Sequence, residues 1–236
     1  MPMTSAPALD GRSTRWEAHR TARREELVQA ALRAITRHGP GVGVDEIAAE
    51  AGTSKTALYR HFADKEQLYL AVAERVSRRI LADLVTAAAA QEHPRAALRA
   101  LVSTYLRLVA DDPDVYWFVT HRPPGSGGAG SSGGGSGGSA DPLAGLSSAV
   151  SAELAAEITR RLTAAGIDAS AAPAWAHGLV GMIRAATDHW MRQRAADPSG
   201  CATADELASQ LTALAWGGLS RAPLSHDESH DHEERP

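Results

Sequence analysis

The sequence of 236 residues predicts an all-α protein. Apolar residues recur at three- and four-residue spacing in one segment after another, as they do along the buried face of an amphipathic helix. No segment alternates apolar and polar residues in the way that indicates a half-buried strand. Helix-breaking pairs such as Gly39-Pro40, His93-Pro94 and Asp112-Pro113 separate the segments. We therefore expect a succession of helices joined by turns.

The N-terminal third of the chain predicts four helices, over about residues 21–38, 44–51, 54–62 and 64–90. The first carries one apolar stripe, formed by Leu27, Ala31, Ala34 and Ile35. The fourth begins after Asp64, which acts as its N-cap, with Gln67 three residues on in a variant of the capping box. This fourth helix is long enough to connect the N-terminal helices to the rest of the chain.

The remaining chain predicts five further helices, over about residues 94–110, 113–121, 146–165, 173–195 and 203–216. Thr203 and Glu206 form a capping box at the start of the last helix. Between the second and third of these helices lies segment 125–139, which contains 9 Gly, 5 Ser and 1 Ala. Such a composition predicts a flexible loop, either an artificial linker or a natural low-complexity insertion.

The stretch from Val44 to Lys65 carries most of the functional information. Its two short helices meet at a turn, where Gly52 tolerates left-handed backbone and Ser54 accepts hydrogen bonds from the free N–H groups of the second helix. Leu58 and Phe62 are four residues apart and face inward. The outer face is left to Lys55, Thr56, Tyr59 and Arg60. Two helices across a Gly-containing turn, the second presenting donors outward, form a helix-turn-helix, which indicates DNA binding.

The run from about Arg20 to Val76 resembles the N-terminal DNA-binding domain of the TetR family of bacterial transcriptional regulators. The matching residues are Ala30-Ala31, Ile35, Val44-Asp45-Glu46-Ile47-Ala48, Ala51-Gly52-Thr53-Ser54-Lys55, Leu58-Tyr59-Arg60-His61-Phe62, Asp64-Lys65-Glu66 and Leu68. The resemblance implies an N-terminal three-helix helix-turn-helix domain followed by a C-terminal helical regulatory and dimerisation domain. It also implies a repressor that a small-molecule effector releases from a palindromic operator.

From the helix pattern and this resemblance we expect four parts of the chain. They are a flexible N-terminal arm at 1–20, the helix-turn-helix domain at 21–66 with its motif at about 43–62, the regulatory domain at 67–220 with the loop at 125–139, and a disordered acidic, His-containing tail at 221–236.

The residues expected at the DNA lie in and around the recognition helix. The N-terminal residues of such a helix contact base edges in the major groove, which favours Lys55, Thr56 and Tyr59 for bases or flanking phosphates. Arg60 and His61 lie further along, where phosphate is the expected partner. The resemblance implies phosphate contacts for Tyr59 and His61. Further phosphate donors are the Lys65 ammonium group, the hydroxyls of Thr53 and Ser54, and the backbone N–H near Val44.

Charge distribution agrees with this placement of the DNA. Residues 1–79 hold 13 Lys and Arg against 10 Asp and Glu, whereas residues 80–236 hold 11 against 18. Phosphate attracts the basic end and repels the acidic one.

The single cysteine, Cys201, allows no internal disulfide. The N-terminus lacks the apolar stretch of a signal peptide and no apolar run is long enough to span a bilayer, so we expect a cytoplasmic protein with no membrane partner and no cofactor.

Paired half-sites on DNA require a two-fold dimer, and the resemblance implies that the last two helices form its interface. Gly178 and Gly181 permit close approach of the helices. The candidate interface residues are Trp175, Leu179, Met182, Ile183, Ala186 and Trp190 on one helix and Leu207, Leu211 and Leu214 on the other. Each stripe alone is also compatible with a core inside one subunit.

The resemblance further implies an effector site within the C-terminal domain. An apolar cavity with a few polar groups suits such a site. The candidate lining residues are Tyr105, Tyr116, Trp117, His121, Met182 and Arg184. A filled core without any ligand is the alternative.

Three other function classes have weaker support. Against an enzyme, Asp188 and His189 are adjacent on a helix and point to different faces, and no Gly-rich phosphate loop follows a strand. Against a metal site in the tail, the candidate ligands belong to a polar segment without supporting structure; they are His226, Asp227, His230, Asp231 and His232. Against an architectural DNA-binding protein, the C-terminal part of the chain is acidic.

Overall fold

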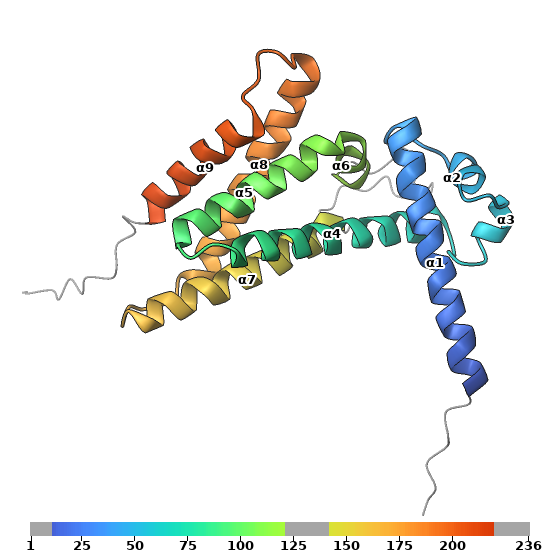
Figure 1. The fold of residues 1–236 in the computed structure, drawn as a ribbon, viewed down its shortest axis with the longest axis horizontal. Coiled ribbons are helices and arrows are strands. Elements are labelled where there is room, and N and C mark those ends of the chain that lie inside the picture. Colours follow the sequence, from blue (N-terminus) through green and yellow to red (C-terminus); the bar gives the residue numbers. More distant parts are fainter. Residues whose placement is uncertain (1–10, 121–141, 220–236) are drawn as a thin grey trace, which may run out of the picture. The chain divides into compact units, whose positions relative to one another are not determined.

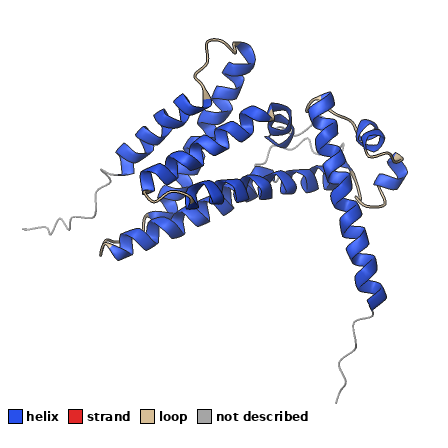
Figure 2. Ribbon diagram, in the orientation of Figure 1, coloured by secondary structure: helices blue, strands red, loops and turns tan. Residues whose placement is uncertain are grey.

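Two packing units make up the protein in a computed structural model that describes residues 11–120 and 142–219 (Figure 1). Within these ranges every regular element is a helix (Figure 2), which confirms the predicted all-α class. The predicted loop at 125–139, the tail at 221–236, His121 and the first ten residues of the predicted arm lie outside the described residues.

The first unit holds the helix-turn-helix. It contains α1 (Gly11–His38), α2 (Val44–Glu50), α3 (Lys55–Leu58), the first part of α4 (Lys65–Ala89) and α6 (Pro113–Thr120). Its core combines residues of the predicted apolar stripes with residues of α4 and α6. These side chains are at most 1 % exposed: Leu27, Ile35, Leu58, Phe62, Val72 and Val119. Burial of apolar side chains stabilises the short helices α2 and α3, because a helix of one or two turns is not stable alone.

The second unit is built from longer helices. It contains the rest of α4 with α5 (Pro94–Asp111), α7 (Pro142–Ala164), α8 (Ala172–Ala196) and α9 (Ala204–Leu219). Helix α5 lies beside α9 and also contacts α8 (Figure 1). The buried face of α5 consists of Leu98, Val102, Ser103, Leu106 and Val109.

The predicted turn and cap residues take the conformations that their sequence indicates. Gly52 has a φ of +61°, and the N–H groups of Gly52 and Thr53 donate to the carbonyls of Ala49 and Ala48 at 3.0 and 2.9 Å. The Asp64 carboxylate accepts from the Gln67 N–H at 2.7 Å. The capping box at the start of α9 is reciprocal. Thr203 Oγ1 accepts from the Glu206 N–H at 3.2 Å, and Glu206 Oε2 accepts from the Thr203 N–H at 2.8 Å.

Two helix starts differ from the prediction. Helix α1 begins at Gly11 instead of residue 21, so the second half of the predicted arm is helical. Residues 11–20 contain no proline, and a helix once nucleated extends at little cost through Arg, Glu and Ala even where it is exposed. Helix α7 begins at Pro142 instead of Leu146, because proline fits the first turn of a helix.

The limits of the packing units also differ from the expected boundary after residue 66. The first part of α4 packs with the helix-turn-helix: Tyr69 donates its hydroxyl to the Val119 carbonyl at 2.9 Å and its ring lies 5.2 Å from that of Phe118. Arg75 of the same helix pairs with Glu25 of α1 at 2.7 Å. These contacts place α4 up to Arg78 in the first unit. The chain from Asp112 onward, which includes α6, belongs to the same unit.

Candidate nucleic-acid interface

Helix α3 is shorter than the predicted recognition helix. It ends at Leu58, and residues 59–62 continue as a turn in which Arg60 and His61 donate their N–H groups three residues back, to Ala57 and Leu58, at 3.3 and 2.9 Å. Leu58 and Phe62 nonetheless both face inward, at 0 % and 1 % exposed. The tighter turn keeps both anchors buried and presents Tyr59 and Arg60 on the outer side.

The start of α3 has the cap that the sequence predicts. The Ser54 hydroxyl oxygen accepts from the Ala57 N–H at 3.1 Å. Because its oxygen is the acceptor, the hydroxyl hydrogen of Ser54 is still able to donate to a phosphate. In contrast α2 has no side-chain cap, since the residue before it is Gly43.

Lys55 is the first residue of α3 and pairs with an acidic residue of α2. Its ammonium nitrogen lies 3.0 Å from Asp45 Oδ2, with both side chains largely exposed. The hydrogen bond from Lys55 to Asp45, together with the charge of that carboxylate, raises the pKa of Lys55 above its ordinary value. Lys55 is therefore fully charged at neutral pH, and in the protein alone its partner is Asp45.

Arg24 of α1 contacts the end of the recognition segment, which consists of α3 and the turn after it (residues 55–62). Its guanidinium donates to the His61 carbonyl at 2.9 Å and lies 4.4 Å from the centre of the Phe62 ring. The His61 Nδ1 atom is buried and lacks a hydrogen-bond partner among the described residues. Any contact of His61 with phosphate must therefore come from Nε2.

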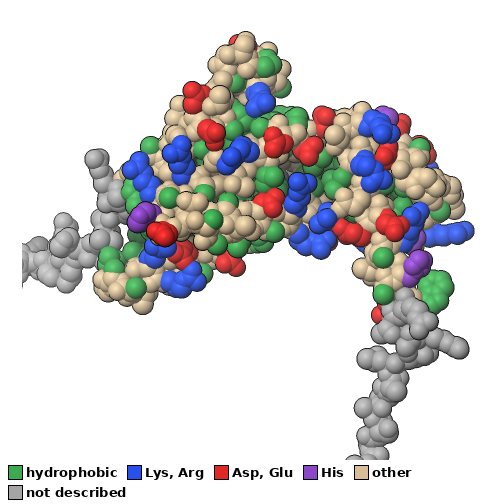
Figure 3. All heavy atoms as spheres, viewed as in Figure 1, with side chains coloured by type: hydrophobic (Ala, Val, Ile, Leu, Met, Phe, Trp, Pro, Cys, Tyr) green, Lys and Arg blue, Asp and Glu red, His purple; other side chains and the backbone are tan. Residues whose placement is uncertain are grey.

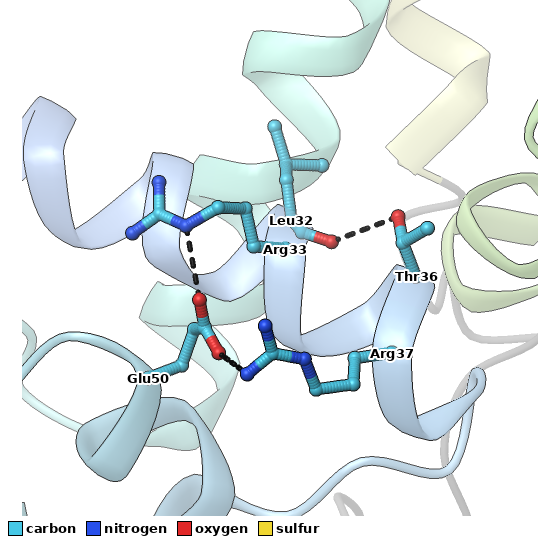
Figure 4. A network of polar contacts seen from close by, with 5 residues as sticks. All are labelled: Leu32, Arg33, Thr36, Arg37 and Glu50. Atoms are coloured by element: carbon cyan, nitrogen blue, oxygen red, sulfur yellow. Dashed lines mark hydrogen bonds and ion pairs between the residues drawn. The ribbon is translucent and has the colours of Figure 1, made fainter.

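Glu50, the last residue of α2, joins that helix to α1. Arg33 and Arg37, one turn apart on α1, both point toward its carboxylate (Figure 4), with N–O distances of 3.0 and 2.7 Å. The Glu50 side chain is only 11 % exposed. This bridge fixes α2 against α1 and so sets where the start of α3 lies.

The predicted DNA-contacting residues differ in accessibility. Ser54, Lys55, Thr56 and Arg60 are exposed, Thr53, Tyr59, His61 and Lys65 are half-buried, and the Val44 side chain is buried. Val44 is also the first residue of α2, so its backbone N–H, the group predicted to contact phosphate, has no acceptor within that helix. On the face drawn in Figure 3, basic and acidic side chains are interspersed.

Three residues near this interface were not singled out from the sequence: Arg24, Asp45 and Glu50. Arg24 is 37 residues from its partner His61, and Glu50 is 13 and 17 residues from its arginines. No spacing rule connects residues so far apart. Asp45 belongs to the stretch that resembles the family and is an acid in the first turn of a helix, where it suits the helix dipole, but neither feature indicates its pairing with Lys55.

The candidate dimer residues fall into three groups by exposure. Leu179, Trp190 and Leu211 are 9 %, 3 % and 7 % exposed within one subunit, so they form its core and offer little area to a partner. The Trp190 indole N–H donates to the Ala202 carbonyl at 2.8 Å, which fixes that ring inside the unit. Leu214 is 64 % exposed. The half-buried candidates are Trp175, Met182, Ile183, Ala186 and Leu207.

The candidate effector residues belong to both units. Tyr116 is buried and Trp117 half-buried in the first unit, with their rings 5.4 Å apart. Tyr105, Met182 and Arg184 are half-buried in the second unit.

No group of three or more His, Cys, Asp or Glu side chains is placed in the described ranges to hold a metal ion, and the His-containing tail lies outside those ranges. No helix in the same ranges is both long and apolar enough to cross a membrane.

The N-terminal and C-terminal parts of the chain each match a known protein family. Residues 27–72 match the family described as bacterial regulatory proteins, tetR family. Residues 83–230 match the tetracyclin repressor-like C-terminal domain.

Individual proteins agree with the family match. A helix-turn-helix-type transcriptional regulator of Mycobacterium tuberculosis is 36 % identical over 211 residues, covering 89 % of this chain and 82 % of the relative. The transcriptional activator FasR of Mycolicibacterium smegmatis is 28 % identical over 210 residues, 87 % of each chain. The structure of FadR from Bacillus subtilis in complex with stearoyl-CoA has a TM-score of 0.58 at 15 % identity, covering 82 % of this chain and 98 % of that one, and shows the same fold. The chain belongs to the TetR family of bacterial DNA-binding transcriptional regulators and is not an enzyme.

Proposed function

We propose that the protein is a homodimeric repressor that binds an inverted-repeat operator and is released by a small-molecule effector. The observation that carries the DNA-binding part is the outer face of the recognition segment. Exposed Lys55, Thr56 and Arg60 lie on a segment that Leu58 and Phe62 anchor in the core. A rigid support with donors outward is the arrangement that contact with base edges and phosphates requires.

Within this proposal the contacts divide by position. Lys55 donates to guanine O6 or N7, and the Thr56 methyl group contacts a thymine methyl. Tyr59, Arg60 and His61 contact phosphate. The remaining phosphate donors are Thr53, Ser54, Lys65 and the Val44 backbone N–H, which lie in the turn or at helix starts.

The dimer contact that we propose uses the exposed faces of α8 and α9. On α8 the exposed residues include Ala174, Gly178, Gly181 and Ala185, which allow a second helix to approach closely. On α9 the exposed Leu214 supplies an apolar side chain large enough to be buried by a partner. The core residues Leu179, Trp190 and Leu211 support these faces from inside the subunit.

Effector control follows from differential affinity for two conformations of the dimer. Helix α4 runs from the first unit into the second and is the continuous element through which a ligand in the second unit would act on DNA binding. The FadR structure from Bacillus subtilis is a complex with stearoyl-CoA. Long-chain acyl-CoA is therefore the first compound class to test, with free CoA as its control. FasR is an activator by name, so activation is the alternative mode of control.

Selection of bound sequences from a random duplex library tests the DNA part. An enriched inverted repeat is expected. Lys55→Ala and Tyr59→Ala should each weaken binding to it, by about 1–3 kcal/mol where the contact is to a base. Arg99→Ala is the matched control, because it removes a positive charge from an exposed position on α5. Enrichment of a single half-site, or equal losses in all three variants, would contradict the proposal.

The dimer contact is tested by the oligomeric state. Leu214→Glu places a charge on the proposed interface and should yield monomers in light scattering, with loss of operator binding. Val85→Glu makes the same change at another exposed apolar residue, 49 % exposed on α4, and should leave the dimer intact. A dimer that survives Leu214→Glu would exclude this face.

A further inference from the structure

The ion pair between Asp45 and Lys55 lies where the protein is to meet DNA. Lys55 begins α3 and Asp45 lies in the first turn of α2, so both belong to the helix-turn-helix itself. Their charged atoms are 3.0 Å apart, and their side chains are 50 % and 73 % exposed. An acidic group therefore holds the first cation of the recognition helix at a surface expected to carry phosphate.

Fold stability does not explain this pair. An ion pair between two exposed side chains contributes little to folding, because water and salt screen the charges and two long side chains are held in one geometry. The bridge that holds α2 on α1 is a different one, made by Glu50 with Arg33 and Arg37. Asp45 makes no contact of that kind with α1 among the described interactions.

The Lys55 ammonium group cannot pair fully with the Asp45 carboxylate and with a DNA group at the same time. For the Lys55 ammonium to reach a base or a phosphate, its bond to Asp45 has to be broken or shared. The carboxylate then remains near phosphates, which repel it. Both effects oppose binding.

We propose that Asp45 sets the affinity of this protein for its operator by competing with DNA for Lys55. The proposal rests on the DNA contact proposed for Lys55. Its consequence is that the protein binds its operator less tightly than the same helix-turn-helix with a neutral residue at position 45. Weaker binding allows an effector with a modest preference for the released state to empty the operator, since an effector shifts the equilibrium only by its differential affinity.

The size of the effect follows from the exposure of the pair. An exposed ion pair changes an equilibrium constant by up to about fivefold. Asp45→Asn should therefore tighten operator binding about two- to fivefold per subunit, and about four- to twenty-fivefold for a dimer. The dependence of binding on salt should become steeper, by up to about 0.9 in the log–log slope for each phosphate that Lys55 neutralises.

Glu46→Gln is the matched control for the loss of one negative charge. Glu46 is exposed in the same turn of α2, but its side chain is turned back toward Gly43: a β-carbon built on that glycine would lie 2.5 Å from Glu46 Oε2. A general charge effect would appear in both variants, whereas competition for Lys55 appears only in Asp45→Asn.

The experiment measures affinity for the selected operator and for a scrambled duplex of equal length, using the full chain, Asp45→Asn, Glu46→Gln, Lys55→Met and the Asp45→Asn/Lys55→Met double variant. The gain from Asp45→Asn should exceed that from Glu46→Gln and should shrink when Lys55 is absent. An equal gain in the Lys55→Met background, or a gain no larger than that of Glu46→Gln, would overturn the competition. Weaker operator binding by Asp45→Asn would overturn it as well and would assign Asp45 to base contact.

These outcomes separate the inference from the proposed function. If Lys55→Met leaves operator affinity unchanged, the DNA contact proposed for Lys55 is wrong and the inference fails with it. If Lys55→Met weakens binding while Asp45→Asn behaves like Glu46→Gln, only the inference fails.

A direct observation of the pair is possible because the chain contains only two lysines, Lys55 and Lys65. Reductive methylation with ¹³C-formaldehyde labels these two side chains and the terminal amine. In the free protein, Asp45→Asn should move the Lys55 signal and lower its pKa, because the ammonium loses its carboxylate partner, while the Lys65 signal stays in place. An unchanged Lys55 signal would show that the pair is not populated in solution and would overturn the proposal.

Discussion

The helix-turn-helix and the α5–α9 pair are both helical, but different contacts hold them together. Helices α2 and α3 have 7 and 4 residues, and polar contacts secure the end of α2 through the Glu50 bridge, the start of α3 through the Ser54 cap, and the turn after α3 through the Arg24 contact with the His61 carbonyl. Helices α5 and α9 have 18 and 16 residues and pack along apolar faces. A side-chain hydrogen bond between them runs from Ser103 to Asp205 at 2.8 Å.

The difference follows from helix length. A long helix buries enough apolar area to be held by that alone, whereas a helix of one or two turns buries few side chains and leaves most of its backbone groups without intrahelical partners. Polar contacts therefore orient the recognition segment. Polar substitutions should affect α2 and α3 more than α5 and α9, and apolar truncations should affect both regions similarly.

The largest expected effects come from core truncation. Phe62→Ala should lower the free energy of unfolding by about 3–5 kcal/mol and Leu106→Ala by about 2–5 kcal/mol, because each leaves a cavity at a side chain at most 1 % exposed. Hydrogen exchange should show the loss of protection in α1–α3 for Phe62→Ala and in α5 and α9 for Leu106→Ala. Identical exchange patterns for the two variants would mean that the units unfold as one.

Removal of a helix cap should distinguish the two regions by function. Ser54→Ala should cost about 1 kcal/mol in the free energy of unfolding and also weaken operator binding, because α3 has only four residues to hold its orientation. Thr203→Ala removes the equivalent cap from α9 and should cost a similar free energy without changing operator affinity measured well below the melting temperature. Equal effects on DNA binding would contradict the difference between the regions.

Two glutamates that each pair with two arginines provide a matched test. Glu50→Gln should cost about 1 kcal/mol in the free energy of unfolding, because the carboxylate is nearly buried and joins two helices. Glu157→Gln should cost about 0.3–0.5 kcal/mol, because Arg160 and Arg161 lie on the same exposed helix. Urea denaturation of both variants measures the difference, and a larger loss for Glu157→Gln would contradict it.

The Glu157 contribution should depend on pH. The hydrogen bond from Arg160, with further help from Arg161, lowers the pKa of Glu157. Its stabilising effect is therefore present above the pKa of the unfolded chain and is lost as the pH falls through the folded value. The difference in stability between the wild-type protein and Glu157→Gln should disappear in acid.

The smallest expected effect is a gain. Gly43→Ser supplies the cap that α2 lacks, and the φ of −87° at this position suits serine. The new β-carbon would meet Glu46 Oε2, the mobile end of a side chain that can move away. We expect a few tenths of a kcal/mol in the free energy of unfolding, because glycine is already an acceptable cap. The same change at Gly52, with its φ of +61°, should destabilise the turn and serves as the control.

Local patterns were sufficient for most of the fold. The helical class, the cap at Ser54, the turn at Gly52 and the inward-facing Leu58 and Phe62 all depend on residues within four or five positions of one another, and each is confirmed. The family followed from the same stretch. The start of α1 was wrong because no breaker marks it and an exposed helix leaves no apolar pattern to follow.

By itself, then, the sequence determined the element types, the caps and the membership in the family, because these depend on neighbours along the chain. Only the tertiary structure decided the contacts that orient the interface. It brought Arg24 to His61, Glu50 to two arginines and Asp45 to Lys55, across 10 to 37 residues. It also placed Leu179, Trp190 and Leu211 in the core formed by the chain itself. A helical stripe shows that a face is apolar, but only the packed chain shows whether that face is covered by its own subunit or left for a partner.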